Sequence, residues 1–174
     1  MAQEQRECGQ MHQDRRLFMN CIEESVIFPL PTDQYIAKKE NAWRVKLPDS
    51  YIFHVKKCGG GIPKAKHFVC NKREYVIDRF LCILSEYRTH PLGNYDIGVT
   101  LTQIEDRLSN SPDLVGTELL PIAVLFAGDF VCLDYRDGKE DPCVCVWNHE
   151  ESGIDNPVTY YVTSSYDEFL QMLY

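Results

Sequence analysis

The chain has 174 residues and a mass of 20.2 kDa, with 44% hydrophobic and 25% charged residues. This composition is typical of one globular domain. It excludes a disordered or collagen-like chain. A membrane-spanning chain is also excluded, because no apolar run approaches the roughly 18 residues that span a bilayer. The net charge of −8 is uneven: residues 1–87 carry 14 basic and 11 acidic side chains, whereas residues 88–174 carry 4 and 15. An acidic half argues against direct binding to nucleic acid and permits a basic protein partner.

Eight cysteines suggest a disulfide framework at first sight: Cys8, Cys21, Cys58, Cys70, Cys82, Cys132, Cys143 and Cys145. Disulfide scaffolds, however, are typically small secreted chains. The N-terminal sequence MAQEQRECGQ lacks the apolar stretch of a signal peptide, and several cysteines lie inside apolar runs. We therefore expect a cytoplasmic protein whose cysteines are reduced and mostly buried.

Helices are predicted at the start of the chain. After a polar beginning, apolar residues at helical spacing predict a helix over residues 14–26, which two prolines end. A second helix begins at Thr32 or Asp33, either of which can cap its exposed amides. A third begins at Pro48 and ends at the glycines 59–61, because proline suits a first helical turn and glycine a left-handed cap.

The remainder of the chain is strand-rich. The runs 66–70 and 75–84 flank the polar turn NKRE and predict a hairpin. A helix over 100–108, capped by Thr100 or Thr102, precedes four further strands, and Ser165 caps a final helix. Short turns between consecutive strands predict an α+β fold, with an antiparallel sheet of about six strands and helices packed on one side and at both ends of the chain.

The order of these pieces carries a family signature. LPDSY opens a helix that ends in a glycine pair, Gly60 and Gly61, and later come LLPIAVLFAGDFVCLDYR, an acidic turn, VCVWNHE and the closing helix SSYDEFLQML. In this order the motifs resemble the SUKH superfamily, the group of the yeast cell-wall-synthesis regulator and many bacterial immunity proteins. We expect residues 32–174 to form the SUKH-like domain and residues 1–31 a partly helical N-terminal extension. Three positions depart from the family pattern: His54, Gly59 and Asn148.

The resemblance implies a protein-binding module without catalytic chemistry or a cofactor. Its most concrete form is an immunity protein that neutralises a cognate bacterial polymorphic toxin, often a nuclease, by direct binding. The alternative is a regulatory scaffold without a toxin partner, like the yeast member. The expected partner is a basic toxin domain, with no direct contact to nucleic acid or membrane.

Acidic residues of the second half are the candidate contacts. Two acidic loops flank one strand, and if they share an end of the sheet their fields add and imitate phosphate toward a basic nuclease. A solvated polar surface is the alternative, and Asp129 could instead serve the hairpin turn beside Gly128. Tyr135 and Trp147 are possible aromatic anchors. The candidate partner-binding residues are Asp129, Asp134, Tyr135, Asp137, Glu140, Asp141, Trp147, His149, Glu150 and Glu151, with Asp155 completing the acidic set.

One strand face combines metal-ligand types, since every second residue along it is Cys143, Cys145, Trp147 and His149. These could hold zinc with a further ligand such as Cys132, or form a core face in which the tryptophan packs beside small cysteines. The spacing is not that of a known zinc motif, so we expect no metal. An enzyme could pair a cysteine with His149 and Glu150. Thiols on the same strand lie beyond hydrogen-bond reach of this histidine, so we expect a structural or surface role for it.

Overall fold

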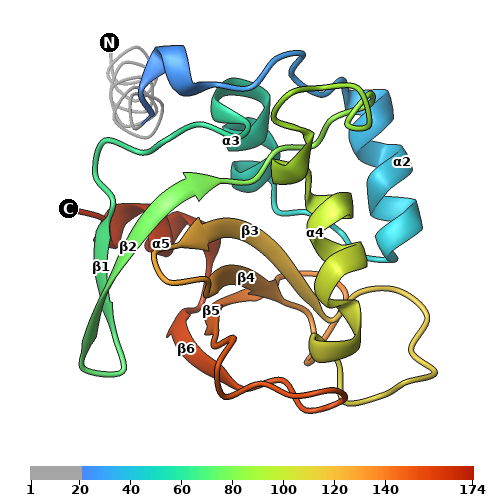
Figure 1. The fold of residues 1–174 in the computed structure, drawn as a ribbon, viewed down its shortest axis with the longest axis vertical. Coiled ribbons are helices and arrows are strands. Elements are labelled where there is room, and N and C mark those ends of the chain that lie inside the picture. The colour runs from blue at the N-terminus through green and yellow to red at the C-terminus, as the bar shows by residue number, and fades with distance from the viewer. Residues whose placement is uncertain (1–20) are drawn as a thin grey trace, which may run out of the picture.

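Six antiparallel strands form one sheet in which every strand pairs with its neighbours in the sequence, in the order β1-β2-β3-β4-β5-β6. Figure 1 shows this computed structural model, which describes residues 21–174. The strands are β1 (His67–Cys70), β2 (Arg73–Phe80), β3 (Leu119–Leu125), β4 (Phe130–Asp134), β5 (Cys143–Trp147) and β6 (Thr159–Thr163). The described helices are α2 (Asp33–Trp43), α3 (Asp49–Cys58), α4 (Ile97–Ile104) and α5 (Tyr166–Met172), with the 3-10 turns η1 (Glu23–Ser25), η2 (Gly93–Tyr95) and η3 (Glu105–Arg107). The predicted α+β fold with its antiparallel sheet is confirmed.

Both faces of the sheet are covered, because side chains of the central strands alternate between two buried clusters. On one face, Leu133 of β4 and Val144 of β5 join the main core, to which α3 and α5 contribute Tyr51 and Phe169. On the other face a smaller cluster lies beside α4: Leu108, Leu119, Cys132, Cys145 and Trp147. The helix α4 (Figure 1) therefore packs beside this smaller cluster through Ile104 and contributes Ile97 to the main core.

The sheet is curled, and three of its strand pairs contain a register shift. Such bulges bend a strand and increase its local twist. The curl brings β1 back toward β6, where the thiol of Cys70 donates to the carbonyl of Tyr161 at 3.3 Å. The last residue protects the β1 edge further, since the N–H and C=O of Tyr174 both pair with His67 at 3.0 Å. These contacts pair part of the backbone at the two edges of the sheet.

Helix starts follow the predicted capping chemistry at α2 and α5. The hydroxyl of Thr32 accepts from the N–H of Tyr35 at 3.2 Å, and that of Ser165 accepts from the N–H of Glu168 at 3.3 Å. Side-chain acceptors of this kind satisfy N–H groups that have no partner within the helix. Across the residues that the structure describes, no helix combines the length and the apolar character needed to cross a membrane.

The helix α4 begins before the two threonines predicted to cap it, because Asp96 supplies the cap. One carboxylate oxygen, Oδ1, accepts from the N–H groups of Gly98 (2.9 Å) and Val99 (3.3 Å). The other, Oδ2, accepts from the N–H of Leu84 at 2.8 Å. The Asp96 side chain is fully buried. It therefore ties α4 to the segment that follows β2.

Residues 21–31 lie against the rest of the domain. The helix predicted over residues 14–26 is wrong from residue 21 onward, where a β-bridge between Cys21 and Pro63 is followed by the short turn η1; its earlier part lies outside the described residues. Local helical spacing is overridden here by tertiary contacts. The side chain of Ile27 is buried beside Cys82 and Leu84, and its N–H donates to the carbonyl of Gly59 at 3.0 Å.

Asp96→Ala is expected to lower the free energy of unfolding by about 2–4 kcal/mol, because three backbone N–H groups lose their acceptor and one lies deep in the domain. Urea denaturation measures the loss. The exposed Asp113 provides a matched control, for which Asp113→Ala should change stability by less than about 0.5 kcal/mol. Equal stability of the two variants would contradict the role given to Asp96.

Gly60→Ala tests the contact of residues 21–31 with the glycine turn. Gly60 has φ +70, and an added Cβ would lie 2.5 Å from Cδ1 and 3.0 Å from Cβ of Ile27. Left-handed backbone at a non-glycine residue and the shift of Ile27 should together cost about 1–3 kcal/mol. Gly138→Ala is the control, because the nearest atom to its added Cβ is 3.8 Å away. Thermal or urea unfolding compares the two, and similar midpoints would refute this packing.

Candidate protein-binding surface

The two acidic loops leave the sheet at opposite ends of β5. The loop of residues 135–142 connects Asp134 to its strand partner Cys143, whereas residues 148–158 connect Trp147 to its partner Thr159. The five residues of β5 separate them by roughly 17 Å at about 3.4 Å per residue. This exceeds the Debye length of about 8 Å at physiological salt, so the expectation that the loops share one end and add their fields is wrong.

Charges in and beside the loop of residues 135–142 are partly compensated. The run DYRDGKED at 134–141 holds four acidic and two basic residues. The guanidinium of Arg136 donates twice to the carboxylate of Asp134, from Nε to Oδ1 at 2.9 Å and from a terminal nitrogen to Oδ2 at 2.5 Å. Lys139 donates to the carbonyl of Thr117 at 3.1 Å. Asp137, Glu140 and Asp141 are exposed, but they stand beside these cations.

Neither candidate aromatic anchor is on the surface. Tyr135 and Trp147 are each only 1% exposed. The hydroxyl of Tyr135 donates to the carbonyl of Lys46 at 2.9 Å, and Nε1 of Trp147 donates to that of Arg107 at 3.0 Å. Both rings therefore hold the domain together in this structure, and the exposed aromatic of the β3–β4 turn is instead Phe126, at 78%.

Asp129 and His149 form a pair that joins the β3–β4 turn to the chain after β5. Asp129 is 3% exposed, and its Oδ1 accepts from the backbone N–H of His149 at 2.9 Å and lies 2.8 Å from Nδ1 of the same residue. The carboxylate of Asp129 thus links the β3–β4 turn to His149 within the domain. The imidazole keeps about a third of its surface exposed, and its bonded partner is a carboxylate rather than a thiol.

Buried polar groups hold the backbone of the loop of residues 148–158. The Oδ1 atom of Asn148 accepts from the N–H of Glu151 at 2.9 Å, and the hydroxyl of Ser152 accepts from that of Val158 at 2.8 Å. Arg107 of η3 donates to the carbonyl of Ser152 at 2.7 Å and also to that of His149. Its guanidinium stacks over Trp147, 5.1 Å from the ring centroid. These hydrogen bonds therefore hold the loop backbone in place within the domain.

We use the name acidic loop surface for the acidic residues of this loop and of η3 together with one exposed isoleucine: Glu105, Asp106, Glu150, Glu151, Ile154 and Asp155. The carboxylate of Glu151 accepts from the hydroxyl of Tyr160 at 2.7 Å. Residues 148–158 contain three carboxylates and no lysine or arginine. Ile154 is 71% exposed, and the N–H of Asp155 donates to the carbonyl of Asp106 at 2.8 Å. Figure 1 shows the β5–β6 loop reaching the end of α4. An open hollow of 500 Å³ lies there, lined by Glu105, Asp106, Leu114, Ile154 and Asp155 among others.

Comparison with known proteins identifies the family. The model of the SUKH_6 family, described as SMI1-KNR4 cell-wall, matches residues 33–170. The chain belongs to this family. No curated protein and no solved structure matches the chain.

Two departures from the SUKH pattern have structural counterparts. Asn148 is 5% exposed, and its side-chain oxygen holds the loop, so an amide fills a structural role there. His54 is 6% exposed and packs against Phe80, with ring centroids 4.4 Å apart. Removal from water lowers the pKa of His54 to about 4, so the imidazole is neutral at physiological pH.

The metal-ligand types on β5 serve the core of this SUKH domain. Cys145 and Trp147 belong to the cluster beside α4, which confirms the predicted core face. In the described part of the chain, the group of three close metal-ligand side chains is a different one: Cys21, His54 and Cys58. The sequence held a partial signal for it, because His54 and Cys58 are four residues apart on a predicted helix. No sequence pattern indicated that Cys21 joins this group, because it is far from both residues along the chain.

Arg107→Met should loosen the loop of residues 148–158 while keeping an unbranched apolar stem against Trp147. We expect faster amide hydrogen exchange in this loop and a stability loss of about 1–3 kcal/mol, because hydrogen bonds from a charged donor are lost. Hydrogen exchange read by mass spectrometry measures the change. Arg88→Met, at an exposed position, is the control. Unchanged exchange in the loop would show that Arg107 does not hold it.

Proposed function

We propose that this SUKH domain is a non-enzymatic protein-binding module that engages a basic protein partner through the acidic loop surface. The observation that carries the proposal is a loop with three carboxylates and no lysine or arginine of its own, whose backbone Asn148 and the neighbouring Arg107 hold in place. Ordering such a loop in advance reduces the entropy lost on binding. The exposed Ile154 beside a hollow supplies the apolar centre, and the carboxylates supply the polar rim that interfaces typically show.

The proposed partner is a cognate polymorphic toxin, and the chain is its immunity protein in the bacterial cytoplasm. Nucleases that bind a phosphate backbone are rich in lysine and arginine around their active sites. A rigid surface with five carboxylates can occupy such a site, because it offers negative charge in place of phosphate. Family membership supports a protein-binding role. The acidity of the second half of the chain supports contact with a basic protein rather than with nucleic acid.

The test uses the toxin domain encoded beside this chain. Co-expression of the wild-type chain should restore growth, and the purified proteins should bind. A triple variant, Glu150→Gln, Glu151→Gln and Asp155→Asn, should bind about 10–100-fold more weakly, because the rim loses its attraction for a basic partner. Calorimetry measures the affinity, and the loss should shrink at high salt.

Asp137→Asn, Glu140→Gln and Asp141→Asn form the matched control, with the same charge removed at the opposite end of β5. This variant should bind within about threefold of wild type, a difference in binding free energy of less than about 1 kcal/mol. A greater loss in the control than in the first triple variant would move the contact to the other loop. Binding without rescue of growth would contradict neutralisation of the toxin. Absence of both binding and rescue would overturn the toxin-immunity proposal and favour a regulatory scaffold without a toxin partner.

A further inference from the structure

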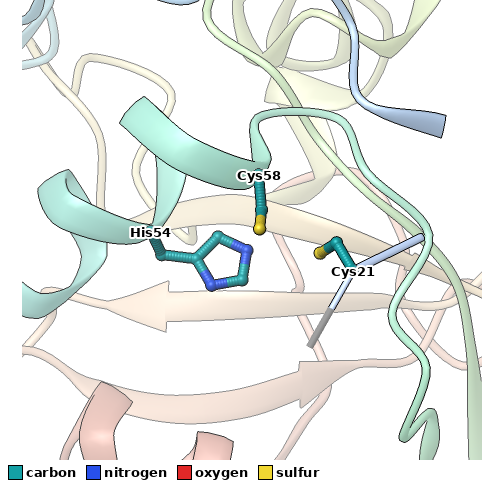
Figure 2. Close-up of side chains that lie close together, drawn as sticks. All are labelled: Cys21, His54 and Cys58. Atoms are coloured by element: carbon teal, nitrogen blue, oxygen red, sulfur yellow. The ribbon is translucent and has the colours of Figure 1, made fainter. Parts of the chain in front are cut away.

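A buried group of three metal-ligand side chains lies away from the acidic loop surface. The ligand atoms of Cys21, His54 and Cys58 all lie within 4.8 Å of one another (Figure 2). All three residues are buried, with exposed fractions of 7%, 6% and 8%. In the close-up, one ring nitrogen of His54 and both sulfur atoms point toward a common centre.

The imidazole of His54 has an unsatisfied nitrogen at this centre. Its Nε2 is buried and has no hydrogen-bond partner. A buried polar atom without a partner is costly, and such atoms in folded proteins call for an explanation such as an ion. The hydroxyl of Tyr166 is likewise unsatisfied, and its ring lies 5.8 Å from that of His54. The local structure thus leaves ligand capacity unused.

Secondary structure holds the three side chains in place. His54 and Cys58 are four residues apart on α3, so their side chains project from the same face of the helix. Cys21 comes from the other side, held by its β-bridge to Pro63. The turn between them is tight: a Cβ at Gly61 would lie 3.1 Å from both Cβ and Sγ of Cys21. The backbone therefore positions the thiols without needing a metal to gather them.

We infer that Cys21, His54 and Cys58 bind a zinc ion that fastens residues 21–27 to α3. Two thiolate sulfurs and one imidazole nitrogen form a donor set that favours zinc over the other divalent ions available to proteins. Binding releases one proton from each thiol, so the two thiolates and the neutral imidazole balance the charge of Zn²⁺. A neutral centre suits a buried, apolar position.

The three protein ligands leave one position of a tetrahedral zinc for a water molecule, which is the arrangement of open zinc sites.

The full-length chain, purified under a non-chelating phosphine reductant and stripped of metal, provides the test. It should bind one equivalent of Co²⁺ with a thiolate-to-cobalt charge-transfer absorption and the visible bands of a tetrahedral site, and Zn²⁺ should displace the cobalt. Zinc should also raise the thermal unfolding midpoint, since a ligand that binds only the folded state stabilises it. His54→Ala and Cys58→Ala should weaken binding at least 100-fold.

Cys70→Ala is the matched control, because Cys70 is also buried but lies outside the group. It should bind metal as the wild type does. Should a ligand variant fail to fold, thiol alkylation of the wild-type chain decides the question: zinc should protect Cys21 and Cys58 and leave Cys143 unprotected. No metal uptake, equal affinity of His54→Ala and Cys70→Ala, or protection of other cysteines alone would overturn the site. These readouts do not involve the toxin, so the zinc inference and the proposed function stand or fall separately.

Discussion

Pairing of each strand with its sequence neighbours is the constraint on which the arrangement of this domain depends. An antiparallel meander sends successive loops alternately to the two ends of the sheet. The β3–β4 turn therefore meets the chain after β5, where Asp129 binds His149, and the loop of residues 135–142 is sent to the other end. Because β5 keeps the two acidic loops apart, total charge is a poor guide to the potential at either one. Local compensation decides it: Arg136 and Lys139 lie at one end, whereas at the other end Arg107 donates to the loop carbonyls.

The sequence predicted the fold well where local chemistry decides the structure. Short polar turns between apolar runs located the hairpins, and Thr32 and Ser165 located two helix starts. The start of α4 was predicted too late, since its cap is Asp96 rather than Thr100 or Thr102. Helical spacing near Cys21 was misleading because this residue forms a β-bridge to Pro63, which is a long-range contact.

The candidate site was less predictable than the fold. A tryptophan or tyrosine in an interface and one in a core look the same in a sequence, because both bury a large ring and offer one polar atom. Tyr135 and Trp147 proved to be core residues whose polar atoms bond to backbone carbonyls. Arg107 gave no signal either, because its role depends on carbonyl groups that only the folded loop of residues 148–158 brings within reach.

Buried and exposed side chains have different roles in the loop of residues 148–158, and this difference has an evolutionary consequence. Buried groups, Asn148 and Ser152 with the guanidinium of Arg107, define its backbone, whereas the side chains of Glu150, Ile154 and Asp155 project into solvent. Substitutions at exposed positions away from such anchors usually change stability by less than about 0.5 kcal/mol. The outward side chains can therefore change while the loop backbone persists, so that related chains can keep one framework under different outer surfaces.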